Sequence, residues 1–320
     1  MGGGAAAVEG YNNRMMRGEL EKEFGARLRF VRNPTGEEIR SAHVVLCNVG
    51  TRDNEGWDRP FALPEEQEKR VEECVNNNPH TVVIVTSGSG IRMTGWNDKA
   101  RAIVYAWYGG QIGNTALAEI LSGKTNPSGK LPMTIEREFT DSPASGYIPA
   151  GETLYTHWSG KEENAHPVYD VRYKEGVFVG YRWYEKRNIE PLYPFGHGLS
   201  YTTFAYDSLK VSPEEFSRGD VVTVSFAVRN TCSVQGAETA QLYVEDVVSS
   251  VPRPVKELKG FVKVELAPGE SRKVELHLDK DAFSFWDAGS KSWVAEKGKY
   301  ILHVGSSSKD IRLRKEIELR

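Results

Sequence analysis

The residues best suited to chemistry lie in one loop, which reads Asp53-Asn54-Glu55-Gly56-Trp57-Asp58-Arg59-Pro60. It holds three acids, an arginine and a tryptophan within seven positions, directly after the apolar run His43–Cys47. In an open α/β sheet, ligands bind in the crevice at the carboxyl ends of the strands. A carboxyl group there can protonate a leaving oxygen, an indole can face a sugar ring, and a guanidinium can orient hydroxyls or a second carboxylate. The loop therefore suits sugar chemistry, although charged loops at strand ends are more often simply solvated.

Strand-like and helix-like segments alternate through the first half of the chain and would position this loop. The predicted strands are Arg27–Val31, His43–Cys47, Thr81–Thr86 and Ala102–Trp107, and the predicted helices are Glu19–Phe24, Pro64–Asn76 and Gly113–Leu121. The helix after the loop places Val71, Cys74 and Val75 on one face and carries acids in its first turn, where they suit the helix dipole. Strands separated by helices predict a mostly parallel sheet with flanking helices, an α/β sandwich.

From about Asp207 the apolar period changes to two, which is typical of half-buried strands. The alternating runs are Val222–Val228, Val274–Leu278 and Tyr300–Val304, with turn signals at Ser217–Asp220, Ala267–Glu270 and Glu296–Gly298. Short alternating strands with regular turns predict an all-β antiparallel sandwich.

An aromatic-rich stretch with weak periodicity joins the two halves. Its rings are Tyr147, Tyr155, Trp158, Tyr169, Tyr173, Phe178, Tyr181, Trp183 and Tyr184. So many rings do not belong in a free linker, and we expect them to pack between domains. The sequence therefore divides into residues 1–135 (α/β domain), 136–205 (connecting segment) and 206–320 (β-sandwich).

Composition and charge exclude several classes of function. The net charge is −3 with no basic block, so the chain carries no nucleic-acid footprint. No apolar run approaches the roughly 18 residues that cross a bilayer, so we expect no membrane segment. The seven histidines lack ligand spacing, which predicts no metal site. Cys47, Cys74 and Cys232 form no CxxC; we expect buried thiols, with a single disulfide left open.

Two glycine-containing runs resemble phosphate-binding or dinucleotide-binding loops, but each lacks a glycine that the motif requires. Leu121–Thr125 has Ala118 where the first glycine of a phosphate loop belongs, and it ends a helix instead of opening one. Ser87–Gly90 follows a strand but lacks the third glycine of a dinucleotide fingerprint. The second run predicts a turn that lets the chain pass close to a ligand or partner. We expect no cofactor.

Two longer runs are more specific. Trp107–Gly113 continues to Asn126–Pro132, and Tyr193–Tyr201 follows much later; each reads as a rigid corner built from Pro and Gly with an anchoring ring. Taken with Glu55-Gly56-x-Asp58-Arg59 and with later markers, these runs resemble glycoside hydrolase family 3, the family of β-glucosidases and β-xylosidases, in which they occur in the same order. The later markers are Pro254–Phe261, Ala267–Glu270 and Val304–Ser308.

The resemblance covers nearly the whole chain and implies a fold and a site. It implies the α/β sandwich domain, clipped at its N-terminus, followed by a fibronectin type III-like domain. The family is retaining, with a nucleophile and an acid/base carboxyl about 5–5.5 Å apart. By resemblance Glu55 is the general acid/base, although Glu65 and Glu66 could be confused with it. Asp58 and Arg59 would support the loop by pairing with each other, and Trp57 would line the sugar site or pack under the loop.

One element of the family is missing from the sequence. The family's nucleophile is an aspartate in a (β/α)8 barrel, commonly within Ser-Asp-Trp. This chain has no Ser-Asp-Trp and no room for a barrel of about 250 residues. We therefore expect the acid/base-bearing portion of a β-glucosidase for β-linked glucosides or oligosaccharides, with little activity alone.

The surface that would meet the barrel should expose apolar side chains. A homodimer, poor solubility or dependence on a barrel partner would follow. The alternatives are a non-catalytic carbohydrate-binding or interaction module, and an inactive truncated remnant.

Overall fold

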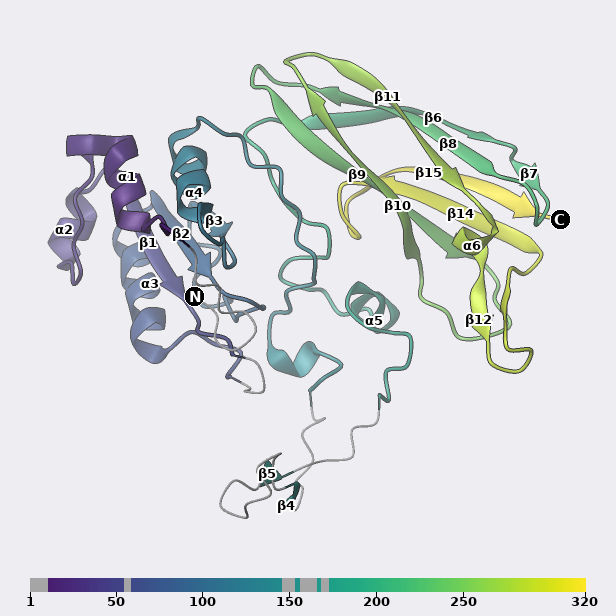
Figure 1. Cartoon of the computed structure of the whole chain (residues 1–320), viewed down its shortest axis with the longest axis horizontal. Helices are drawn as coiled ribbons and strands as arrows, with labels where there is room; N and C mark the ends of the chain where they lie inside the picture. The colour runs from purple at the N-terminus through teal and green to yellow at the C-terminus, as the bar shows by residue number, and fades with distance from the viewer. Residues whose placement is uncertain (1–10, 55–58, 146–152, 156–165, 168–172) are drawn as a thin grey trace.

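The structure is a computed structural model that describes residues 11–54, 59–145, 153–155, 166–167 and 173–320. An α/β layer lies at one end and a β-sandwich at the other, and the connecting segment with its short helix α5 (Tyr181–Lys186) runs between them (Figure 1). The fold class expected from the sequence, an α/β sandwich followed by an all-β sandwich, is confirmed.

The α/β layer contains a three-stranded sheet in the order β1-β2-β3, and its strands are parallel. The strands are β1 (Val45–Gly50), β2 (Thr81–Thr86) and β3 (Ala102–Tyr105), and the helices are α1 (Met16–Phe24), α2 (Gly36–Ser41), α3 (Glu65–Asn77) and α4 (Gly113–Ser122). Helix α3 packs on β1 and β2 and against α2, while α1 packs against α4. Short 3-10 turns follow at Gly25–Arg27 and Phe139–Asp141.

The helix over 64–76 is confirmed in place and orientation. Val71, Cys74 and Val75 of α3 are buried and join Val83 and Val85 of β2 in one apolar cluster. Helix α4 ends where the sequence indicates, because Gly123 adopts a left-handed backbone with φ of 81°.

Three expectations from the sequence are wrong. Arg27–Val31 forms no strand: within the described chain β1 pairs only with β2, and this segment adds no strand at the open edge of β1. The strand expected over Ala102–Trp107 ends at Tyr105, because the left-handed Trp107, with φ of 52°, turns the chain out of the sheet. Cys232 is exposed, since it lies in the turn after β8, whereas Cys47 and Cys74 are buried thiols as expected.

The β-sandwich consists of a five-stranded sheet in the order β10-β9-β14-β15-β7 and a three-stranded sheet in the order β11-β8-β6. Its strands are β6 (Phe204–Ser212), β7 (Glu215–Phe216), β8 (Val222–Asn230), β9 (Gly236–Asp246), β10 (Glu257–Leu266), β11 (Ser271–Leu278), β14 (Gly298–Gly305) and β15 (Ile311–Leu319). The smaller elements are α6 (Lys280–Phe283), the hairpin β12 (Phe285–Asp287) with β13 (Ser292–Val294), and the pair β4 (Thr153–Tyr155) with β5 (His166–Pro167).

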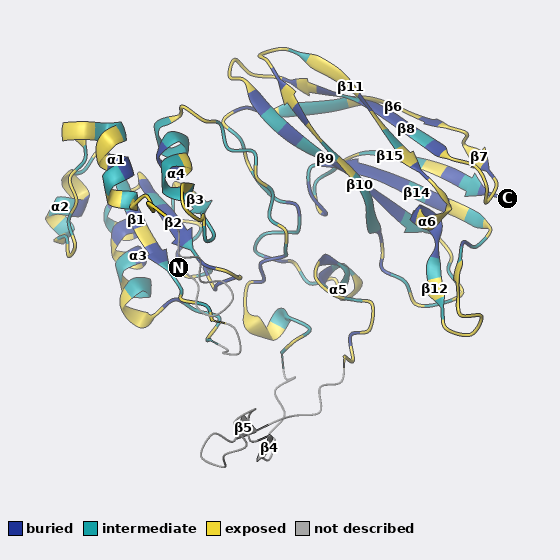
Figure 2. Cartoon of the chain, viewed as in Figure 1, coloured by how far each residue is buried: buried dark blue, intermediate teal, exposed yellow. Residues whose placement is uncertain are grey.

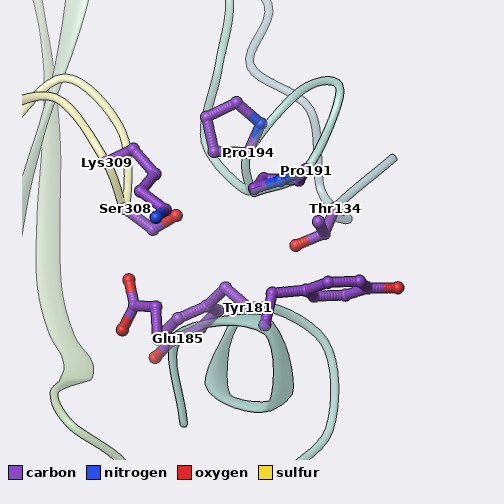
Figure 3. A pocket seen from close by; sticks show the side chains of 8 residues that line it. Thr134, Tyr181, Glu185, Pro191, Pro194, Ser308 and Lys309 are labelled. Carbon is purple, nitrogen blue, oxygen red and sulfur yellow. The ribbon is translucent and has the colours of Figure 1, made fainter. Parts of the chain in front are cut away.

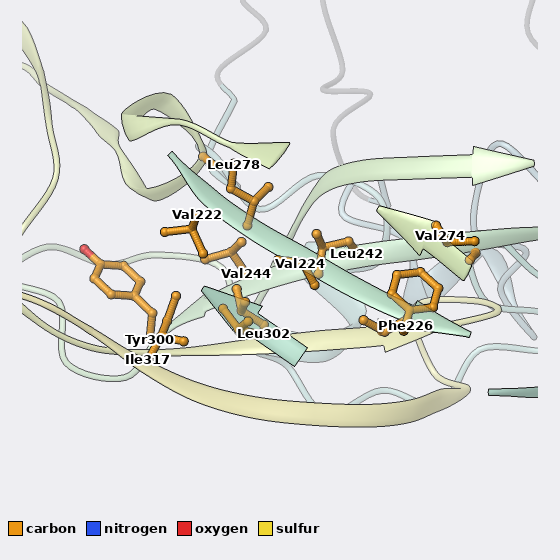
Figure 4. Packing of buried hydrophobic residues seen from close by; sticks show 14 of the residues in the cluster. Val222, Val224, Phe226, Leu242, Val244, Val274, Leu278, Tyr300, Leu302 and Ile317 are labelled. Carbon is orange, nitrogen blue, oxygen red and sulfur yellow. The ribbon is translucent and has the colours of Figure 1, made fainter. Parts of the chain in front are cut away.

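The sandwich core follows the period of two. Val222, Val224 and Phe226 of β8 point between the sheets and meet Leu242 and Val244 of β9, as Figure 4 shows. Buried residues run through the strands of both sheets (Figure 2), and in β9 they include Gln241 and Tyr243 on the face that α5 covers. The alternating strands predicted from the sequence are therefore present, with the predicted face inward.

The connecting segment is packed only in part. Tyr181 and Tyr184 of α5 are buried, and the Tyr181 ring stacks on Phe195 with centroids 5.0 Å apart and meets Tyr243 edge-on at 5.8 Å. Tyr173, in contrast, is 76% exposed, so the expectation of packing is wrong for this ring. The rings at positions 147, 155, 158 and 169 lie outside the described side chains.

Candidate functional site

The candidate site lies at the carboxyl ends of the three parallel strands. Asp53 follows β1, the turn Ser87–Gly90 follows β2, and Tyr108 follows β3. Because parallel strands end at the same edge, these three connections converge although they are far apart in the sequence. Their side chains form one hydrogen-bonded cluster, which we call the clamp: Asp53, Arg59, Ser87, Ser89 and Tyr108.

The carboxylate of Asp53 is the centre of the clamp. It accepts hydrogen bonds from the Tyr108 hydroxyl (2.8 Å), from the Gly88 backbone N–H (2.5 Å) and from Arg59 Nε. The backbone N–H of Asp53 donates to the same Tyr108 oxygen at 2.9 Å. Burial raises the pKa of Asp53, but the hydrogen bonds from Arg59, Tyr108 and Gly88 outweigh it, so the pKa lies below its ordinary value. Asp53 is therefore a carboxylate that neutralises Arg59.

Arg59 turns its donors inward. Besides Asp53, its guanidinium donates from Nη2 to Ser87 Oγ (3.0 Å), Ser89 Oγ (2.6 Å) and the Gly90 carbonyl (3.1 Å). Nη1 donates to the Pro60 carbonyl at 3.0 Å, and only 19% of the side chain is exposed. Since a guanidinium has five N–H donors, few remain for a ligand. These contacts suit Arg59 to anchoring the loop, one of the two roles expected from the sequence.

Gly88 permits the close approach of the two loops. A β-carbon at this position would lie 2.7 Å from Asp53 Oδ2 and 2.9 Å from Tyr108 Cε2. Such distances are shorter than van der Waals contact, so only glycine fits without a shift of the loop. The turn over Ser87–Gly90 does let the chain pass close to a neighbour, and that neighbour is the chain's own Asp53.

The structure reaches the predicted site only at its edge. Glu55, Trp57 and Asp58 lie outside the described residues, and so does the expected pairing of Asp58 with Arg59. Arg59 lies in the clamp and pairs with Asp53, a partner that sequence reasoning missed. The available signals were the acid at 53 within the same loop and the ring at 108 within the specific run 107–113.

The alternative acids, Glu65 and Glu66, lie in the first turn of α3. Both side chains are more than four-fifths exposed, and they pair with Lys69 (2.6 Å) and Arg70 (2.7 Å) one turn later. Such i,i+4 pairs support an exposed helix face.

Gln67 of the same turn accepts a hydrogen bond from the Gly50 N–H at 2.7 Å and so connects α3 to the end of β1. A polar cleft of about 520 Å³ opens here, lined by Arg32, Asn48, Thr51, Gln67, Arg70 and Thr86 among others.

A second crevice lies between α5 and the sandwich, and it is a packing seam. Tyr181 and Glu185 project from α5 toward Pro191, Pro194 and Lys309, as Figure 3 shows, and the gap is too narrow for a water molecule. Burial raises the pKa of Glu185, and the Lys256 ammonium, with which it pairs, opposes that rise. The seam therefore joins the connecting segment to the sandwich and offers no room for a substrate.

The part of the chain described by the structure holds no cluster of three or more metal-ligating side chains. In the same ranges no helix combines the length and apolar character that a bilayer crossing requires.

Comparison with known proteins identifies both parts of the chain. Residues 1–181 match the glycosyl hydrolase family 3 C-terminal domain, and residues 238–308 match the fibronectin type III-like domain. The chain is 40% identical to thermostable beta-glucosidase B of Acetivibrio thermocellus over 90% of its length, and 37% identical to beta-glucosidase BoGH3A of Bacteroides ovatus over 97%. It covers 36% and 41% of these relatives.

Solved structures give the same result. The crystal structure of the GH3 beta-glucosidase of Bifidobacterium adolescentis matches 99% of the chain with a TM-score of 0.84 and 33% identity, and the chain covers 47% of that protein. The chain therefore belongs to glycosyl hydrolase family 3, and it spans less than half the length of the relatives that it matches.

Proposed function

We propose that this chain is the acid/base-bearing portion of a retaining β-glycosidase, and specifically of a β-glucosidase acting on terminal non-reducing β-D-glucosyl residues. Membership of the family supports the reaction class, and the names of the two relatives above support glucosides as substrates. One observation carries the proposal: both ends of the loop that contains Glu55 are bound together at the carboxyl ends of β1 and β2, where open α/β sheets bind ligands.

In the proposed mechanism Glu55 protonates the glycosidic oxygen as the bond to the anomeric carbon breaks. A carboxylate nucleophile outside this chain holds the glycosyl group, and Glu55 then deprotonates the water that releases it. Trp57 and Asp58 line or support the site, and Arg59 anchors the loop. The nucleophile would come from a (β/α)8 barrel, and the two carboxyls would stand about 5–5.5 Å apart.

We also propose that the boundaries of the domains lie near residues 135 and 205. Two observations support this division: Ile135 is still part of the buried α/β cluster, and the first sandwich strand, β6, begins at Phe204.

The experiment is hydrolysis of an aryl β-glucoside by the purified chain, with and without a separately expressed family 3 barrel. We expect no turnover by the chain alone and turnover with the barrel. Glu55→Gln should lower that turnover by about 10²–10⁴-fold, the usual contribution of a general acid. Glu65→Gln is the matched control, since this acid is exposed on α3 and should leave turnover unchanged.

Three results would contradict the proposal in different ways. Turnover by the chain alone, lost in Glu55→Gln, would mean that a second carboxylate within the chain attacks the sugar. Sugar binding that survives Glu55→Gln without any turnover would favour a non-catalytic carbohydrate-binding module. Neither binding nor turnover under any condition would favour an inactive remnant.

A further inference from the structure

We propose that Asp53 and Tyr108 are positioning residues, which act through Arg59 to hold the proposed acid/base loop in its working place. This inference rests on the proposed function above, but the clamp that it invokes consists only of described residues. Neither Asp53 nor Tyr108 stood out in the sequence as a site residue.

The first step is that the two ends of the loop are fastened to each other. Asp53 and Arg59 form an ion pair, and their side chains are only 23% and 19% exposed. A pair this shielded from water is screened less by salt than a surface pair. Five residues separate this ion pair in the sequence, so it closes a short loop, and closing a short loop costs little chain entropy.

The second step is that each end is also fastened to a different strand. Arg59 binds the hydroxyls of Ser87 and Ser89, which follow β2. Asp53 binds the hydroxyl of Tyr108, which follows β3, both through its carboxylate (2.8 Å) and through its backbone N–H (2.9 Å). One phenol oxygen therefore fixes the backbone and the side chain of the same residue. Loss of this oxygen would release both contacts, and its contact with the Thr51 carbonyl (3.1 Å), while the half-buried ring remained.

The third step concerns charge. The Asp53 carboxylate compensates the Arg59 guanidinium, and Glu55 follows Asp53 by two residues, so their α-carbons are at most about 7 Å apart. Without the negative charge at Asp53, the Arg59 guanidinium would be an uncompensated cation in the loop that carries Glu55. A nearby cation favours the ionised form of a carboxyl group and lowers its pKa. A general acid works only while protonated, so the basic limb of the pH–rate profile would move to lower pH.

The test uses Tyr108→Phe and Asp53→Asn, with Tyr300→Phe as the matched control. Tyr300 is a hydrogen-bonded phenol too, but it is fully buried in the sandwich and donates to the Glu296 carbonyl at 2.8 Å. Hydrogen exchange on the chain alone is measured first. We expect exchange at the amide of Asp53 to accelerate about tenfold in Tyr108→Phe, and exchange at the amide of Gly88 to accelerate likewise in Asp53→Asn. The control should change neither.

The second readout is the pH dependence of kcat/KM with the barrel present. We expect about a tenfold fall in kcat for both variants with KM within twofold of the unmodified chain, and a basic limb at lower pH in Asp53→Asn only. A role confined to stability would lower activity without moving that limb.

The outcomes separate this inference from the function on which it rests. Unchanged exchange at both amides overturns the clamp, whatever the activity. Accelerated exchange with an unchanged kcat and pH profile overturns the positioning role. Absence of turnover by the unmodified chain with the barrel overturns the proposed function, and the positioning role with it, while the exchange data still report on the clamp.

Discussion

At the scale of single residues, Arg59 shows how far a sequence motif predicts a role. Its place beside the loop predicted a supporting residue, and its contacts with Asp53, Ser87 and Ser89 suit that role. The neighbour in sequence, Asp58, was the expected partner, whereas the partner found is six residues away. A fork of five donors can join acceptors from several loops, and a lysine cannot reproduce that geometry.

His197 gives a prediction at the same scale. Burial, and then the nearby Lys130 ammonium, lower the pKa of His197 below its ordinary value, although Asp310 opposes them. The folded chain therefore keeps His197 neutral at a pH where the unfolded chain protonates it, so its contribution to stability is lost as pH falls below about 6.5. The slope that this one group adds is at most about 1.4 kcal/mol per pH unit.

Urea denaturation at pH 5 to 8 checks this prediction. His197→Gln should flatten the fall of the unfolding free energy on the acid side, and His277→Gln, at a site 60% exposed, is the surface control. Equal flattening in both variants would mean that burial at position 197 has no part in the pH dependence. His303 is buried and its pKa is lowered too, so it contributes in the same direction and the flattening is partial.

The sequence did not predict the contacts between side chains that form the clamp. Asp53 and Tyr108 are 55 positions apart, and their contact depends on where three parallel strands end. A sequence motif can identify Glu55 and Arg59 because they lie in one loop. The clamp depends on tertiary structure, which no local sequence pattern contains.

At the scale of elements, the apolar period predicted most of the secondary structure. Helix α3 and strands β2, β8, β11 and β14 occur where the pattern indicated. Helix α3 buries one face, whereas β2 is apolar from Val82 to Val85 and buries consecutive residues. The pattern failed at Arg27–Val31, because Arg27 ends a 3-10 turn and the residues after it join no sheet in the described chain. It failed again at Trp107, because the backbone turns into the left-handed region there within an apolar run.

Helix α2 offers a test at this scale, because it is only six residues long and depends on its cap. Thr35 accepts from the Glu38 backbone N–H at 3.3 Å, and the Glu38 carboxylate accepts from the Thr35 N–H at 2.8 Å, which is a complete capping box. Thr35→Ala should lower the unfolding free energy by about 1 kcal/mol, and Thr35→Ser should restore most of it. Equal denaturant midpoints for Thr35→Ala and the unmodified chain would contradict the cap.

At the scale of the whole molecule, the runs Asn126–Pro132 and Tyr193–Tyr201 lie where the α/β layer, the connecting segment and the β-sandwich meet. Asn126 donates to the Gln235 carbonyl (2.9 Å) and accepts from the Ser200 hydroxyl (2.9 Å) and the Tyr201 N–H (2.8 Å). Lys130 pairs with Glu238 at 3.2 Å, and both side chains are nearly buried. The structural role inferred for these runs from the sequence therefore holds for the residues that make these contacts.

Gly198 tests whether these corners couple the two parts. A β-carbon there would overlap the backbone carbonyl of Gly129, which cannot rotate away. Gly198→Ala should therefore open the junction, cost about 1–3 kcal/mol, and split one unfolding transition into two in calorimetry. Gly129→Ala is the matched control, since a β-carbon at that position meets nothing within 4 Å. A single transition at the original temperature in Gly198→Ala would show that the contact does not couple the parts.

The central claim is that Glu55 is the acid/base of a retaining glycosidase, and rescue by azide tests it most directly. In Glu55→Ala with the barrel present, an aryl β-glucoside with an activated leaving group needs no protonation, so the glycosyl-enzyme still forms. Azide ion then attacks the anomeric carbon and displaces the enzyme carboxylate without a general base. We predict that added azide restores turnover and that the product is the β-glucosyl azide. No rescue, or formation of the α-glucosyl azide, would contradict the assignment of Glu55.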